Sequence, residues 1–212
     1  MVRTSIVNIP VDAVELPAQL RVPDDVAAAV LCVQSRGGRP RRPRRNDVVD
    51  ALHKARVATV VCDLLTEREA AQRADSLAIG WLERRLADVT SWLRHHEGTE
   101  GLQIGYCGAG IAAAAALIAA AEDPTVRAVV SCGGRPDLAA SALPRVRAPT
   151  LLIVGDEDIP LLRVNEQAFA QLRCEKNLRV VRGAGRLFDE AGRGDEVARW
   201  TASWCVRYVI KP

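Results

Sequence analysis

One cysteine and one aspartate in this chain have the side chains and the glycine-rich surroundings that suit nucleophilic catalysis. Cys107 lies within residues 105–110 (GYCGAG), and Asp158 ends residues 155–158 (GDED). A thiol attacks a carbonyl as the thiolate, which forms readily only beside a base or a positive group. The histidines, which are the usual bases, all precede both residues: His53, His95 and His96. The chain beyond residue 96 therefore contains no imidazole.

The elements that must position these residues alternate between short β-branched runs and helical stretches. This pattern predicts an α/β fold with a largely parallel sheet covered on both faces. The expected strands are residues 5–10, 16–22, 29–34, 58–64, 103–109, 128–132, 150–155 and 178–182. The first two are joined by too few residues for a parallel crossover, which predicts an antiparallel hairpin. The expected helices are residues 47–56, two pieces between Thr66 and His95, and residues 111–122, 160–173 and 195–208.

The order of these elements and four local strings resemble the small dienelactone hydrolase-like proteins of the α/β-hydrolase fold. The strings are residues 63–66 (DLLT), 104–106 (IGY, before an alanine-rich helix), 133–139 (GGRPDLA) and 148–155 (APTLLIVG). The resemblance covers essentially the whole chain, and such proteins occur alone or fused to a phosphoribosyltransferase domain. It implies one α/β-hydrolase-like domain over residues 1–212, with an eight-stranded sheet and helices on both faces.

The resemblance also implies a nucleophile on the sharp turn after the fifth strand, followed along the chain by an acid and a histidine. The family's serine falls on Gly110, which has no side chain to attack a carbonyl, and glycine there would relieve about 1–3 kcal/mol of backbone strain. The acid position is retained as Asp158. The histidine position falls on Arg186, which stays protonated near neutral pH and cannot act as a base. We expect an ion pair between Arg186 and Asp158 instead.

A rival hypothesis makes Cys107 the nucleophile of a weak carboxylic-ester or lactone hydrolase. True dienelactone hydrolases carry a cysteine in G-Y-C-x-G-G, and residues 105–110 (GYCGAG) can be laid on that string in a register shifted by three residues. The shift shortens the strand and still supplies no histidine. We therefore favour a small apolar role for Cys107 and a protein of the hydrolase family that is a pseudoenzyme with a degenerate catalytic triad.

The segment after the third expected strand departs from the family as well. Relatives carry an H-G-S-G-like loop that helps to build the oxyanion hole, whereas this chain has Gln34, Ser35, Arg36, Gly37, Gly38 and Arg39. The amides of Gly37 and Gly38 could still point inward. The loop continues as an arginine-rich segment from Arg36 to Arg45 (RGGRPRRPRR). It is either a solvated loop or an anion- or partner-binding module, since arginines hold phosphate groups in a bidentate manner.

Composition also limits which ligands, cellular locations and metal sites can be expected for this protein. The formal charge is only +3, and the arginine-rich segment contains no aromatic residue, which disfavours binding to nucleic acid. No run reaches the about 18 apolar residues of a membrane helix, and no secretory signal starts the chain, so we expect a cytoplasmic protein without a membrane partner. Cys32, Cys62, Cys107 and Cys132 fall near strand ends, but without CxxC spacing a soft-metal or redox site is disfavoured.

The sequence thus predicts a cleft that binds a small molecule or an anionic ligand, with Gln34, Arg36, Gly37, Gly38 and Arg39 as the candidate binding residues. We expect no metal and no cofactor. The ligand and the oligomeric state stay open, and a homodimer is one option.

Overall fold

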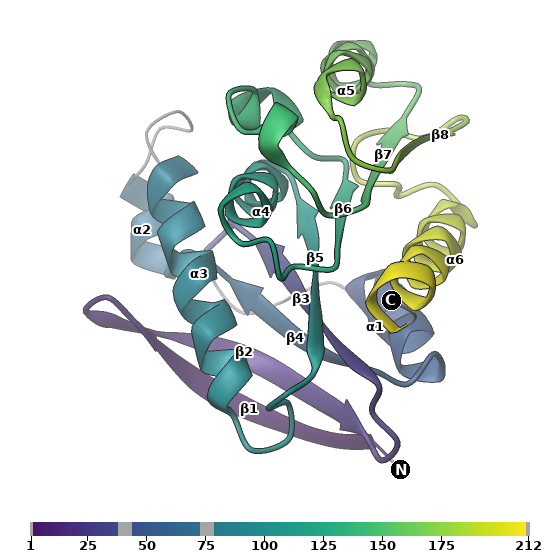
Figure 1. The fold of residues 1–212 in the computed structure, drawn as a ribbon. Helices are drawn as coiled ribbons and strands as arrows, with labels where there is room; N and C mark the ends of the chain where they lie inside the picture. Colours follow the sequence, from purple (N-terminus) through teal and green to yellow (C-terminus); the bar gives the residue numbers. More distant parts are fainter. Residues whose placement is uncertain (1, 38–43, 73–78, 211–212) are drawn as a thin grey trace.

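The computed structural model describes residues 2–37, 44–72 and 79–210 and has the predicted α/β architecture (Figure 1). Within these described residues, eight strands form one sheet in the order β1-β2-β4-β3-β5-β6-β7-β8. Their bounds are β1 Val2–Val11, β2 Val14–Pro23, β3 Ala28–Gln34, β4 Val57–Asp63, β5 Gln103–Ala109, β6 Ala128–Cys132, β7 Thr150–Gly155 and β8 Lys176–Val181. The predicted hairpin is confirmed, because β1 pairs with β2 antiparallel over their whole length. Strands β3 to β8 run parallel to one another.

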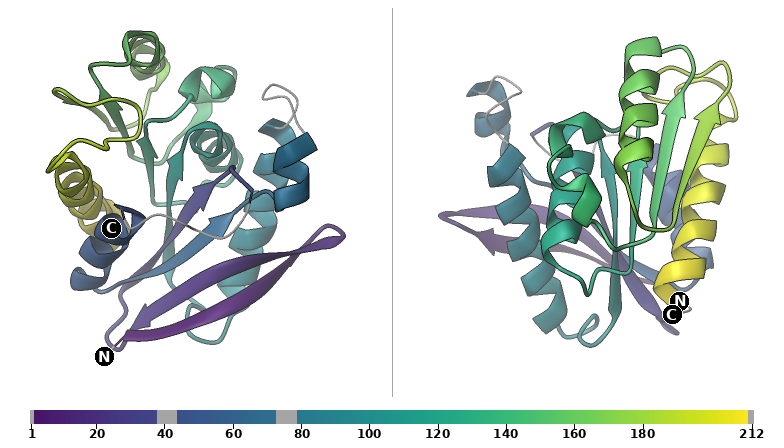
Figure 2. Two further views of the ribbon diagram at one scale, coloured as in Figure 1. Left: turned by 180° about the vertical axis from the view of Figure 1, so that it is seen from behind. Right: turned by 45° about the horizontal axis from the view of Figure 1, so that its top comes forward.

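Helices cover both faces of the sheet (Figure 2). The helices are α1 Arg44–Lys54, α2 Glu67–Gln72, α3 Ile79–His95, α4 Ile111–Glu122, α5 Ile159–Gln171 and α6 Arg193–Cys205. Helices α3, α4 and α5 contribute to one apolar core, and α1 and α6 contribute to a second core on the opposite face. Among the helices of the described residues, none is both long enough and apolar enough to span a bilayer.

The alanine-rich α4 packs unusually close to the sheet. A Cβ atom added to Gly108 of β5 would lie 2.6 Å from the Cα atom of Ala113, and one added to Gly134 would lie 2.7 Å from the Ala113 Cβ atom. Such distances leave no room for a side chain. Glycine in β5 and just after β6, together with alanine on the helix, therefore allows the start of α4 to pack closely against the ends of these two strands, where the candidate site lies.

Helix boundaries differ from the sequence prediction by up to three residues, most at the start of α1 and at the end of the last helix. Helix α1 begins at Arg44, before Asp47, so the last two arginines of the arginine-rich segment belong to a helix. The last helix ends at Cys205 and continues as a π-helical turn, Val206–Ile210. Both changes lie at helix ends, where local sequence signals are weakest.

Candidate functional site

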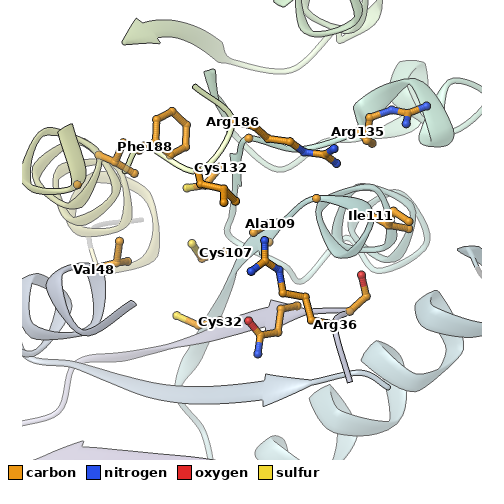
Figure 3. Close-up of a pocket in the computed structure, with 18 residues that line it drawn as sticks. Cys32, Arg36, Val48, Cys107, Ala109, Ile111, Cys132, Arg135, Arg186 and Phe188 are labelled. Atoms are coloured by element: carbon orange, nitrogen blue, oxygen red, sulfur yellow. The ribbon is translucent and has the colours of Figure 1, made fainter. Parts of the chain in front are cut away.

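A cavity of about 660 Å³ opens at the carboxyl ends of β3, β5 and β6. Its wall is completed by the loop after β8 and by residues of α1 and α6 (Figure 3). This edge of a parallel sheet is where ligands generally bind in open α/β folds. Among the described residues that line the cavity, none is acidic and three are arginines, namely Arg36, Arg135 and Arg186.

Gly110 forms the sharp turn between β5 and α4. Its backbone angles are φ 59° and ψ −130°, a conformation that a residue with a side chain adopts only with strain. A Cβ atom added there would have one neighbour within 4 Å, the Nη2 atom of Arg186 at 3.9 Å. The backbone of Gly110 thus has the shape of a nucleophile-bearing turn, and the space above it faces a guanidinium group.

The loop that carries Arg186 is held against the ends of two strands. A Cβ atom on Gly133 would overlap the carbonyl oxygen of Arg186, and one on Gly155 would overlap the carbonyl oxygen of Ala184. Only glycine permits these approaches. The two glycines after β6 and at the end of β7 therefore fix the backbone of the loop and set the position of Arg186 over Gly110.

The fold of this chain matches a solved structure over nearly its whole length. The crystal structure of a dienelactone hydrolase from Anabaena variabilis is 42% identical, covers 98% of this chain and 99% of its own, and superposes with a TM-score of 0.91. The chain belongs to the dienelactone hydrolase family. More distant similarity extends to Est1E of Butyrivibrio proteoclasticus with ferulic acid bound, which is 14% identical with a TM-score of 0.82 over 97% of this chain and 100% of that one. That second likeness shows the α/β-hydrolase fold alone.

Curated relatives of this dienelactone hydrolase-family chain are longer proteins. Two proteins from strains of Mycobacterium tuberculosis, named as candidate phosphoribosyl transferases, are 41% identical over 200 residues. The match covers 94% of this chain but 45% of theirs, so the chain spans less than half the length of these relatives. No family profile matches the sequence.

Asp158, the residue at the family's acid position, lies three residues after the end of β7 and caps α5. Its Oδ1 atom accepts a hydrogen bond from the amide of Leu161 at 3.1 Å. Although the structure describes both Asp158 and Arg186, no ion pair joins them, and Asp158 does not line the cavity. The expected ion pair is therefore wrong, because the carboxylate serves the start of α5 while the guanidinium group extends over Gly110.

The first residues of the loop after β3 line the cavity, and a buried carboxylate holds the backbone of this loop. The amide of Arg36 donates to both carboxylate oxygens of the buried Asp63, at 3.2 and 3.1 Å. Gln34 and Arg36 line the cavity, whereas Gly37 has φ 71° and packs against Ala70 of α2. The other two candidate binding residues, Gly38 and Arg39, lie outside the described residues.

Three thiols line one wall of the cavity. Figure 3 shows the sulfur atoms of Cys32, Cys107 and Cys132 along the same side. A hydrogen bond with Cys107 and burial raise the pKa of Cys132, which keeps that thiol protonated. Cys62 packs in the opposite core, and none of the six cysteines, all of which are described, forms a disulfide. In the described part of the chain no three histidine, cysteine or acidic side chains group in a way that could hold a metal ion.

Arg135 and the apolar wall of the cavity were not anticipated as parts of the site. Arg135 donates to Asp137 through Nε at 2.8 Å and Nη2 at 2.7 Å, and these hydrogen bonds lower the pKa of Asp137. Phe188 and two valines, from α1 and α6, add apolar surface. The sequence pattern places Arg135 near a strand end, but it gives no sign that elements so far apart in the chain share one wall.

Proposed function

We propose that this chain is a dienelactone hydrolase-family protein without ester or lactone hydrolase activity, which binds a small molecule in the cavity. The observation that carries the proposal is the guanidinium group of Arg186 over the side-chain-free turn at Gly110. Hydrolysis of this kind needs a nucleophile on the turn and a base that accepts its proton. Glycine offers no nucleophile, and arginine remains protonated at neutral pH.

The positions of the histidines support the loss of proton transfer. His53 in α1 is hydrogen-bonded through Nε2 to the Oγ1 atom of Thr59 at 2.9 Å. His95 ends α3, and His96 follows it with its ring centroid 4.4 Å from that of Trp92. None of the three lines the cavity, so the described site has no imidazole within reach of a bound ester.

Cys107 is the basis of a second candidate function, a weak carboxylic-ester or lactone hydrolase. Its side chain lines the cavity. However, Cys107 lies inside β5 rather than on the turn, and its relative exposure is 7%. Because no histidine is among the described residues that line the cavity, the usual base that would take the thiol proton is missing, and we rank this function second.

The decisive experiment measures hydrolysis of p-nitrophenyl acetate and of a dienelactone by the purified chain and by three variants. We expect the unaltered chain and Gly110→Ser to show no rate above background, because Arg186 cannot accept the serine proton. The double variant with Gly110→Ser and Arg186→His supplies both missing groups and is the minimum repair. Turnover by the unaltered chain that Cys107→Ala abolishes would replace our proposal by the second candidate function.

The role of the chain beyond this cavity is also a proposal. The longer relatives named as phosphoribosyl transferases suggest that a domain of this kind accompanies a separate catalytic domain, where ligand binding would have a regulatory role. We place the protein in the cytoplasm, in keeping with six cysteines that form no disulfide.

A further inference from the structure

We infer that the cavity binds a carboxylate or a phosphate monoester carried on a compact apolar body, with the oxyanion over Gly110 beside Arg186 and Arg36. This inference rests on the proposed function and names the ligand class of the same cavity. The charges of the wall, the free space at its floor and the apolar surface opposite the arginines each support it.

The positive charge of the wall is only partly compensated. Arg135 forms an ion pair with Asp137, whose carboxylate neutralises its charge. Arg36 and Arg186 form no ion pair with any described residue, and no acidic residue is among the described residues of the wall. Figure 3 shows both side chains extending into the cavity from opposite sides. Arginine forms its strongest hydrogen bonds with carboxylate and phosphate oxygens, so an anion is the ligand group that suits this pair.

The floor of the cavity has space and hydrogen-bond donors for such an anion. The position of an added Cβ atom on Gly110 is open except for Arg186 Nη2 at 3.9 Å, so an oxygen atom just above it can reach hydrogen-bonding distance of the guanidinium group. Gly110 also precedes the 12-residue helix α4, whose N-terminus has no side-chain cap. The unpaired amides of the first helical turn favour negative charge at this point.

The opposite wall suits an apolar body. Figure 3 shows Val48 of α1 and Phe188 on the side of the thiols, and Leu187 and Val197 of α6 add apolar surface to the lining of the cavity. The volume of about 660 Å³ is within the range of small-molecule sites. A ligand with one oxyanion and an aromatic or aliphatic body would satisfy both halves of the cavity, whereas a free inorganic ion would leave the apolar half unfilled.

Isothermal titration calorimetry with phenyl phosphate, benzoate and benzyl alcohol tests this assignment on the full chain. We expect both anions to bind more tightly than the neutral alcohol, and Arg186→Ala to weaken anion binding by about 10- to 100-fold. The tighter of the two anions identifies the natural group as phosphate or carboxylate. Arg163→Ala on α5 is the matched control, because it removes the same charge from an exposed position outside the cavity and should leave the affinity unchanged. Binding of the alcohol as tight as that of the anions, no anion binding, or an unchanged affinity in Arg186→Ala overturns the inference.

A reporter thiol tests the anion position without any ligand. In Gly110→Cys the introduced thiolate would occupy the proposed oxyanion position, so its pKa should lie below the ordinary cysteine value of about 8.5 and rise when Arg186→Ala is added. The pH dependence of iodoacetamide labelling, resolved by peptide mass spectrometry, measures this pKa. An ordinary pKa that does not respond to Arg186→Ala overturns the anion position. The ester assay separates the two proposals. If the anions do not bind and no ester is hydrolysed, the proposed loss of hydrolase activity still stands. If the chain hydrolyses esters through Cys107, the proposed loss of activity is wrong whether or not the anions bind.

Discussion

Replacing Gly133 by alanine should destabilise the protein by more than the same change at Gly192. Both glycines have positive φ, 53° and 75°, so alanine introduces backbone strain at each. They differ in their surroundings. A Cβ atom on Gly133 would overlap the carbonyl oxygen of Arg186, whereas one on Gly192 would have no neighbour within 4 Å. Gly192→Ala is therefore a matched control that isolates the contact between Gly133 and the loop.

The expected difference follows from these two contributions. Left-handed backbone strain should lower the free energy of unfolding by about 1–2 kcal/mol in each variant. In Gly133→Ala the overlap should lower the free energy of unfolding by about a further 1–3 kcal/mol, which is the usual cost of overpacking, unless the loop moves away. For a chain of this size each kcal/mol lowers Tm by about 2–4 °C, so Gly133→Ala should melt about 4–8 °C below Gly192→Ala when the overlap contributes about 2 kcal/mol.

Circular dichroism melting and urea unfolding of the two variants measure this difference. If the loop moves to relieve the overlap, Arg186 leaves its place over Gly110, and phenyl phosphate should bind more weakly to Gly133→Ala than to Gly192→Ala. Equal Tm losses together with equal affinities would refute the reasoning, because the carbonyl of Arg186 would then not rest on Gly133.

Three further predictions concern ionisable groups. Burial opposes ionisation of Glu69, but hydrogen bonds from Arg85 and Thr66 outweigh it and lower the pKa from 4.5 to about 2. This shift should contribute about 3 kcal/mol to the free energy of unfolding above pH 4.5, and the contribution should be lost as the pH falls toward 2. Urea unfolding at a series of pH values should show that Glu69→Gln lacks this loss of stability in acid. Burial is the main cause that lowers the pKa of His53, so the folded state binds its proton less readily than the unfolded state; stability should fall as pH drops through the ordinary histidine pKa, and His53→Gln should flatten that slope. Iodoacetamide should label Cys107 slowly in the folded chain, and labelling faster than that of a free model thiol at neutral pH would support a reactive nucleophile.

The fold was predictable because the residues that end its strands and helices are recognisable in the local sequence. Strands β5, β6 and β7 and helix α4 have the predicted bounds. Glycine, proline or acidic residues lie at the ends of these runs, and such residues stop a strand or a helix wherever the chain later packs. The start of α1 was missed because Arg44 and Arg45 follow a proline in a segment whose composition is that of a loop.

By itself, the sequence determined the α/β fold, its resemblance to the dienelactone hydrolases and the absence of any imidazole after residue 96. These follow from residue types and their order along the chain. Only the tertiary structure decided that Arg186 lies 3.9 Å from the Cβ position of Gly110, that Asp158 caps α5 instead of pairing with Arg186, and that no acidic residue is among the described residues of the cavity wall. The partner of a side chain depends on how distant segments approach one another, here through overlaps that only Gly133 and Gly155 permit, and no local pattern of residues encodes that approach.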